Sequence, residues 1–205
     1  MSLVELIAQA DERGLAASGL ACLDRCVPLL GGDDEVLRPL WGSLAGDPAG
    51  AAGGDGDWAE RLERARGTLA AAAPEGAAGD EATELARGML ATAPAARTAG
   101  EVRAWADACS VASLRIHRLL DPAEDAAPDG PLPEALVLAR AGAGPVEGRT
   151  EGMSPLVAAE LRRQVAVLEL LAGHGTAGLR QALEVCTEGR RVLRAVVSRR
   201  ARGRV

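Results

Sequence analysis

Residues 98–121 of the 205-residue chain read TAGEVRAWADACSVASLRIHRLLD, and this stretch predicts one long amphipathic helix. Thr98 and Glu101 have the spacing of a capping box, in which each residue satisfies a backbone N–H of the other at a helix start. The helix is expected to stop near Leu120, because Pro122 disfavours α conformation at Asp121. Apolar residues recur in steps of three and four along one stripe, at Val102, Trp105, Cys109, Ala112, Ile116 and Leu119.

A regular apolar seam of this length needs other helices to cover it. The opposite side of the same helix is expected to face solvent. It carries Arg103, Asp107, Ser110, His117 and Arg118.

The composition favours helix throughout the chain. There is no Phe, Tyr, Lys or Asn, so the core is expected to be built from Leu, Val and Ala with three Trp. Sequences rich in Ala and Leu favour helix over strand. The missing residues have AT-rich codons, which points to a high-GC bacterium. The sequence therefore predicts an all-α fold, an irregular multi-helix bundle with Gly/Pro-rich loops.

The N-terminal region predicts a helical hairpin followed by one more helix. Ser2 and Glu5 form a second capping box, and Gly14 has the position of a helix C-cap. A second helix is expected from Leu15 to Val27, and a third element has Pro39 in its first turn. Further helices are expected from Asp57, with Glu60 as its capping partner, over Asp80–Thr92 and over Glu134–Ala141.

The C-terminal region predicts a second helical hairpin. Ser154 and Pro155 have the pattern of an N-cap followed by a first-turn proline. The stretch VAVLELLA at residues 165–172 is apolar almost all round, which predicts deep burial. The turn over residues 173–175 separates this helix from the last one.

We expect a single all-helical domain over residues 1–205. Its expected parts are 1–44 (hairpin plus helix), 57–121 (middle helices), 122–153 (a linker with a short helix), 154–200 (C-terminal hairpin) and 201–205 (basic tail). The helix at 98–121 and the last two helices are expected to form the core, with residues 1–44 packed against them.

The sequence also limits the compartment and the class of protein. No 18-residue apolar run is present, so no membrane span or membrane partner is expected. The N-terminus lacks the pattern of a signal peptide, which favours the cytoplasm, where the four cysteines would stay reduced. There is no phosphate loop, dinucleotide-binding glycine pattern, Gly-x-Ser-x-Gly or His-Glu-x-x-His, so an enzyme with a standard motif is disfavoured, and no cofactor is predicted.

A metal site is a minor alternative. Cys22 and Cys26 are four residues apart on one face of a helix, and His117 or His174 could complete a ligand set. Structural zinc sites usually take their thiols from turns, and cysteines on apolar seams behave as small hydrophobic residues. We therefore predict core cysteines and no metal.

Charge is distributed unevenly along the chain. Residues 1–60 hold eleven acidic residues and three Arg, whereas residues 189–205 hold no acid. Such a basic tail could bind nucleic acid, an acidic partner or the acidic N-terminal part of a second copy. Its seven arginines are Arg190, Arg191, Arg194, Arg199, Arg200, Arg202 and Arg204.

Residues 163–183 resemble the first half of a winged-helix repressor, with an apolar helix, a Gly turn and a second helix. The continuation EVCTEGRRVLRAVV lacks the second turn and the Ser/Thr/Gln-rich recognition segment, so the chain is not assigned to that family.

The sequence leaves three hypotheses for the function of the protein. We favour a non-enzymatic protein-interaction or regulatory module with an unknown partner or self-association. The alternatives are a DNA-associated regulator that uses the tail, and a small-molecule- or metal-binding bundle.

Overall fold

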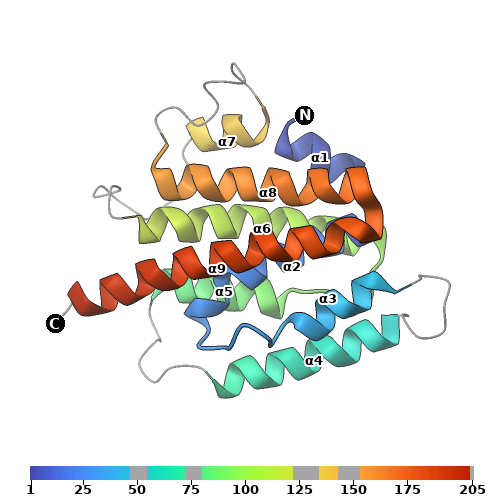
Figure 1. Cartoon of the computed structure of the whole chain (residues 1–205), viewed down its shortest axis with the longest axis horizontal. Helices are drawn as coiled ribbons and strands as arrows, with labels where there is room; N and C mark the ends of the chain where they lie inside the picture. Colours follow the sequence, from blue (N-terminus) through green and yellow to red (C-terminus); the bar gives the residue numbers. More distant parts are fainter. Residues whose placement is uncertain (47–54, 73–79, 122–133, 143–152, 204–205) are drawn as a thin grey trace.

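The computed structural model describes residues 1–46, 55–72, 80–121, 134–142 and 153–203, and these contain helices and turns but no strand (Figure 1). This confirms the all-α prediction. The α-helices are α1 (Leu3–Gln9), α2 (Glu12–Cys26), α3 (Arg38–Ala45), α4 (Asp55–Ala71), α5 (Glu81–Ala91), α6 (Ala99–Leu120), α7 (Glu134–Arg140), α8 (Pro155–His174) and α9 (Gly178–Gly203). Two short 3-10 helices, η1 (Val27–Leu29) and η3 (Gly175–Ala177), follow α2 and α8. Most of the predicted Gly/Pro-rich loops and the residue Arg204 lie outside the described residues.

Most helix starts follow from local sequence signals. Ser2 and Glu5 form the complete capping box of α1. At the start of α6 the Thr98 hydroxyl accepts from the Glu101 N–H at 3.4 Å, while the Glu101 carboxylate accepts from that hydroxyl at 2.7 Å. Pro39 lies in the first turn of α3, and Pro155 begins α8, as predicted.

Two predicted boundaries are wrong. Gly14 is not a C-cap but lies in the first turn of α2, where its N–H donates to the side chain of the N-cap Asp11 at 2.7 Å. Asp57 does not begin α4, which starts two residues earlier. The Asp57 carboxylate instead pairs with Arg61 at 2.7 Å. At the start of α2 the side chain of Asp11, three residues before Gly14, supplies the N-cap.

Helix α2 is the centre of the molecule. Every residue from Gly14 to Cys26 is buried, and α2 contacts α6, α8 and α9. In Figure 1, α6, α8 and α9 run side by side across the molecule, while α3 and α4 lie on the opposite side from α1 and α7. Residues 1–44 therefore do pack against α6, α8 and α9 as predicted, but the prediction of a core built from those three helices alone is wrong, because α2 is itself part of it.

Small residues allow α2 to be surrounded. A Cβ at Gly19 would lie 2.6 Å from the Trp105 ring of α6, so only glycine permits this approach. On α9, a Cβ at Gly189 would lie 2.4 Å from Cδ of Arg25. The apolar periodicity of α2 predicted burial of one face only. The Ala, Ser and Gly residues on its other faces are also covered by neighbouring helices.

The three tryptophans are buried, and each indole N–H has an acceptor. Trp58 and Trp105 pack edge to face with ring centroids 6.3 Å apart, and they donate to the carbonyls of Pro94 and Met89. Trp41 donates to Asp24 at 2.9 Å. These large rings supply the bulk that Leu, Val and Ala do not.

Helix α8 is less buried than predicted. Val167, Leu168 and Leu171 face the core, whereas Glu169 and Ala172 are exposed. The apolar run is therefore amphipathic in the folded chain, and its outer side is covered only in part. Among the described residues, no helix combines the length and the apolar character needed to cross a membrane.

Candidate functional site

An ion pair between Arg25 of α2 and Glu160 of α8 lies at the centre of the helix bundle. Nε and Nη2 of Arg25 donate to the two carboxylate oxygens of Glu160 at 2.8 and 2.6 Å. Both side chains are fully buried. Two parallel hydrogen bonds from a guanidinium to a carboxylate are the strongest arrangement of this pair.

Polar side chains of α6 and α8 complete the hydrogen bonding of Glu160. The Ser113 hydroxyl and the Gln164 amide donate to Oε1 at 2.8 and 2.9 Å. Ser110 donates to Gln164 at 2.6 Å. We call this group, together with Arg25 and His117, the polar centre.

His117 lies inside the polar centre and not on the surface, so its predicted position is wrong. Only 1% of its side chain is exposed. Its Nδ1 lies 2.7 Å from the Ser113 carbonyl, which can only accept, so Nδ1 carries the proton of the neutral ring. Its Nε2 lies 3.5 Å from the Glu160 carboxylate. Ser110 and His117 are buried because α8 covers the side of α6 that the sequence assigned to solvent.

Burial and charge have opposite effects in the polar centre. Burial by itself raises the pKa of Glu160, but Arg25, His117 and Gln164 hold that pKa at about 2. Burial opposes the charge of Arg25, yet Glu160 keeps the Arg25 pKa well above its ordinary value. Burial lowers the pKa of His117, and Glu160 offsets this only in part. At neutral pH the centre therefore holds a charged pair beside a neutral histidine.

The cysteines are free and buried, and three of them line the polar centre. Nη2 and Nη1 of Arg25 lie 3.5 and 3.7 Å from the sulfurs of Cys22 and Cys186. Cys26 lies 3.9 Å from the Ser113 hydroxyl. Burial raises the pKa of Cys22 to about 12, with Arg25 acting against it. Because the thiolate is the reactive form, these thiols are poor nucleophiles and poor metal ligands in this setting.

The weak metal candidates are not assembled into a ligand set. Cys22, Cys26 and His117 lie in the core, whereas His174 is exposed at the end of α8. Within the described part of the chain, no three His, Cys, Asp or Glu side chains are grouped so that they could hold a metal ion.

The sequence patterns did not single out Arg25, Glu160 or Gln164 as members of a site. A signal was present in α8, because Glu160 and Gln164 share the stripe of Val157, Leu161 and Leu168. A charged residue on an apolar stripe indicates a buried partner. The identity of that partner, in a helix far away in the sequence, had no local signal.

Several arginines of the predicted basic tail are engaged within the chain. Arg190 is buried and pairs with Asp24, which corrects its assignment to an exposed contact surface. Arg194 pairs with Asp34 at 2.6 Å, and Arg200 donates to the Leu119 carbonyl at 2.5 Å. The remaining tail arginines within the described residues, Arg191, Arg199 and Arg202, are exposed. The acidic N-terminal region and the basic tail therefore meet within one molecule.

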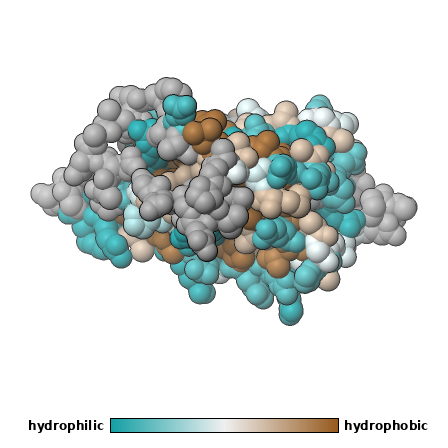
Figure 2. Space-filling model, turned by 90° about the horizontal axis from the view of Figure 1, so that it is seen from above, coloured by the Kyte–Doolittle hydropathy of each residue, from teal (hydrophilic) through white to brown (hydrophobic). Residues whose placement is uncertain are grey.

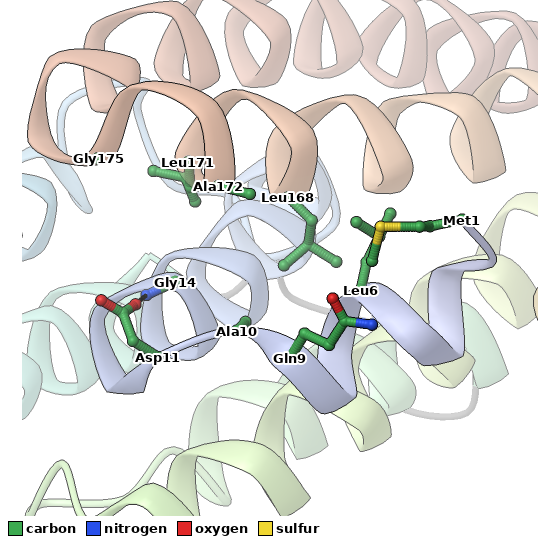
Figure 3. Close-up of a pocket in the computed structure, with 10 residues that line it drawn as sticks. All are labelled: Met1, Leu6, Gln9, Ala10, Asp11, Gly14, Leu168, Leu171, Ala172 and Gly175. Carbon is green, nitrogen blue, oxygen red and sulfur yellow. Dashed lines mark hydrogen bonds between the residues drawn. The ribbon is translucent and has the colours of Figure 1, made fainter.

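A groove with a volume of about 440 Å³ lies between α1, the start of α2 and the end of α8 (Figure 3). We call it the α1–α8 groove. The Leu168 side chain points toward α1, and Met1 and Leu6 lie at the same end of the groove. Gln9 extends toward α8, and Asp11 lies near the end formed by Gly175. The lining side chains include one carboxylate, that of Asp11, and neither Lys nor Arg.

The electrostatics of the α1–α8 groove favour positive charge. The C-terminus of α8 ends at the groove, and the partial negative charge of a helix C-terminus attracts cations. The N-terminus of α2 has the opposite polarity, but the side chain of Asp11 caps it.

These observations separate two kinds of site. The polar centre has the residue types of catalysis, but its ion pair is sealed from solvent and its thiols are protonated. The α1–α8 groove is open and carries no catalytic constellation. No family model, curated protein or solved structure matches this chain.

Proposed function

We propose that this chain is a non-enzymatic protein-interaction module, and that the α1–α8 groove binds a basic amphipathic helix of a partner protein. The observation that carries the proposal is a groove that combines apolar walls with two features that favour cations, the Asp11 carboxylate and the C-terminus of α8. Leu6, Leu168 and Leu171 supply apolar walls. An amphipathic helix in a groove is a recurrent mode of peptide recognition, with anchors spaced three and four residues apart.

Further exposed apolar side chains lie on α1 and α7. The large hydrophobic residues exposed within the described ranges all lie in or beside α1 and α7: Met1, Val4, Val137 and Leu138. The end of α7 lies against the start of α1, because a Cβ at Gly142 would lie 2.6 Å from Cβ of Ser2. Figure 2 shows the molecule from the side of α1 and α7, where hydrophobic residues lie at several places among hydrophilic ones. Large apolar side chains exposed on one side of a molecule are consistent with an interaction surface there.

The polar centre supports the non-enzymatic part of this proposal. A catalytic acid or base must reach a substrate directly or through one water. Arg25, Glu160 and His117 are at most 1% exposed and make their hydrogen bonds to one another and to neighbouring helices. Their arrangement fits a role in holding α2, α6 and α8 together.

The DNA-associated alternative has less support. Arg190, Arg194 and Arg200 already bind groups within the chain, which leaves fewer tail arginines for phosphate contacts. The charges of Arg190 and Arg194 are partly neutralised by Asp24 and Asp34. Nucleic acid therefore stays a second candidate with no contact that favours it over a protein partner.

The direct test is peptide binding measured by fluorescence polarisation. The probe is a labelled synthetic amphipathic helix of Leu, Ala and Arg, with a matched peptide in which Glu replaces Arg. We expect saturable binding of the Arg peptide at about 150 mM salt, where the Debye length is about 8 Å. The Glu peptide is expected to bind weakly or not at all.

A pair of variants assigns the binding to the groove. Ala172 is exposed and lines the groove, and Ala70 is exposed on α4 on the other side of the molecule. A172R is expected to weaken binding of the Arg peptide by at least about tenfold, or about 1.4 kcal/mol. A70R adds the same charge and should leave the affinity unchanged. Equal affinity of both variants, or no saturable binding to the unmodified protein, would contradict the proposal.

Self-association is a separate outcome of the same design. Sedimentation of the unmodified protein and of A172R reports the oligomeric state directly. A dimer that A172R dissociates and A70R does not would assign the groove to a second copy and overturn the proposed partner protein.

A further inference from the structure

The two ends of the α1–α8 groove differ in chemistry. In Figure 3, α1 runs along the groove from Met1 toward the start of α2, and α8 ends on the facing side at Gly175. The end at Met1 is apolar, with Leu6 and Leu168. The end at Gly175 carries Asp11, the one charged side chain among the residues that line the groove. A ligand that fills the groove therefore meets apolar side chains at one end and a negative charge at the other.

Asp11 keeps one carboxylate oxygen for a ligand. Its Oδ1 accepts from the Gly14 N–H at 2.7 Å, and the residue is exposed. Oδ2 forms no hydrogen bond or ion pair with any residue that the structure describes. Arg13, the nearest arginine in the sequence, donates instead to the Gly46 carbonyl at 3.1 Å. A cationic group of a ligand therefore finds an unused carboxylate oxygen at this end of the groove.

The end of α8 adds to this asymmetry. The last turn of a helix carries a partial negative charge on its carbonyl groups. At α8 this turn lies in the groove beside Gly175. The carbonyls near the end of α1 are less available, because Arg103 of α6 donates to those of Ile7 and Ala8 at 3.0 and 2.8 Å. The negative potential therefore comes from Asp11 and α8, and both lie at the same end.

We infer that the partner helix lies antiparallel to α8, with a basic residue in its first turn against Asp11 and apolar residues in its second half against Leu6 and Leu168. The orientation rests on the proposed function, because it concerns the helix that the groove is proposed to bind. Antiparallel packing places the partial positive charge of the partner N-terminus beside the C-terminus of α8. Leu168 and Gly175 are seven residues apart. This spacing is about 10 Å along a helix, so the apolar anchor follows the basic residue by about two turns.

A nitroxide label on the peptide, combined with the amide NMR spectrum of the full chain, measures the orientation directly. The peptide is a helix of about 14 residues, roughly 21 Å long, with Arg in its first turn, Leu in its second half and Ala elsewhere. With the label at the peptide N-terminus, the Gly175 amide signal should broaden more than the Leu6 amide signal. With the label at the peptide C-terminus, that order should reverse. The opposite order, or equal broadening of both signals, overturns the inference.

A second peptide of the same composition, with Leu first and Arg in the last turn, tests the orientation by affinity. It should bind about two- to fivefold more weakly in fluorescence polarisation, because it cannot match both the charge of Asp11 and the dipole of α8. Arg near a C-terminus stabilises a helix, so this peptide is the better helix and helicity cannot explain the expected preference. Equal or tighter binding of this peptide overturns the orientation.

The A172R variant separates failure of the orientation from failure of the proposed function. When A172R weakens both peptides but their affinities for the unmodified protein are equal, the groove still binds a helix and only the orientation is wrong. When neither peptide binds saturably, the proposed function fails, and the orientation fails with it.

Two aspartate variants assign the cation to Asp11. Asp11 and Asp33 are both exposed, and each accepts a backbone N–H through Oδ1, from Gly14 and Glu35 respectively. Asn caps a helix as well as Asp does, so D11N should fold normally, which thermal unfolding followed by circular dichroism checks. D11N should weaken binding of the peptide with Arg first by about two- to fivefold. D33N, in the turn before α3, should leave it unchanged, and equal affinity of the two variants overturns the role of Asp11.

Discussion

Arg25 and Glu160 lie 135 residues apart in the chain and form a two-point ion pair with no exposed surface. The pair joins α2 to α8, and Ser113 joins α6 to the same carboxylate. Removing two charges from water is costly, and their attraction repays that cost only when the geometry is good and the remaining lone pairs are bonded. Here both conditions are met, so breaking the pair from one side should be severe.

Replacing one partner of this pair should destabilise the fold strongly. E160Q leaves the Arg25 charge buried and unpaired, which costs about 3–5 kcal/mol. The double variant R25M/E160M removes both charges and should recover a large part of that loss. Urea denaturation followed by circular dichroism measures each free energy of unfolding.

The exposed pair Arg64–Glu60 serves as the control for this cycle. Its side chains are 67% and 71% exposed, so E60Q should change the free energy of unfolding by less than about 1 kcal/mol. A loss in E160Q as small as that in E60Q would contradict the structural role of the buried pair.

Stability should fall as the solution becomes mildly acidic, because of His117. Its folded-state pKa lies below the ordinary value of 6.5, so the unfolded chain takes up a proton at higher pH than the folded chain. The free energy of unfolding should therefore decrease as pH falls below about 6.5. Urea titrations from about pH 8 to about pH 5 span the ordinary histidine pKa and measure this slope.

The second histidine provides a matched control. His174 is exposed, so H174Q should keep the pH dependence of the unmodified protein. H117Q should lose it. Identical slopes in H117Q and H174Q would show that another group causes the acid response.

A second acid transition should follow at lower pH, because of Glu160. Its pKa falls from 4.5 to about 2 on folding, so its contribution is present above pH 4.5 and lost as pH falls toward 2. This shift corresponds to about 3 kcal/mol. Asp24 acts in the opposite sense, since burial raises its pKa. About pH 3 lies between the two Glu160 pKa values. A free energy of unfolding as large there as at neutral pH would contradict the proposed role of Glu160.

Two glycine-to-alanine variants should have effects of opposite sign. At Gly19 of α2 a Cβ would lie 2.6 Å from the Trp105 ring, so G19A should lose about 1–3 kcal/mol through overpacking. At Gly67 of α4 a Cβ would meet nothing within 4 Å, so G67A should gain about 0.5–1 kcal/mol from helix propensity. Thermal unfolding measures the change in stability of both variants. An unchanged stability of G19A would show that α2 and α6 can move apart at little cost in free energy.

The four buried thiols should react slowly with Ellman's reagent in the native protein. Burial raises the pKa of Cys22, Cys26, Cys109 and Cys186, so little thiolate is present at neutral pH. Reaction should accelerate with added urea in parallel with unfolding. A fast phase in the native protein would reveal a thiol that solvent reaches without unfolding.

The sequence by itself determined where most helices begin and end. The signals at Ser2, Thr98, Pro39 and Pro155 act within one turn of the chain, and the structure confirms each of these starts. The two wrong boundaries are the C-cap predicted at Gly14, where Asp11 instead caps the start of α2, and the start predicted at Asp57, which lies two residues inside α4. Local hydrogen bonds and fixed backbone angles decide helix ends, so a local pattern is sufficient to predict them.

Only the tertiary structure decided which side chains are buried together. The pattern of α6 predicted that His117 faces solvent, but α8 covers it. The charge of the tail predicted an exposed Arg190, but Arg190 is buried and pairs with Asp24. The sequence gives no distance between residues so far apart. A buried charge is stable only beside its partner, and that partner is fixed by how α2, α8 and α9 pack, which depends on contacts distributed over the whole chain.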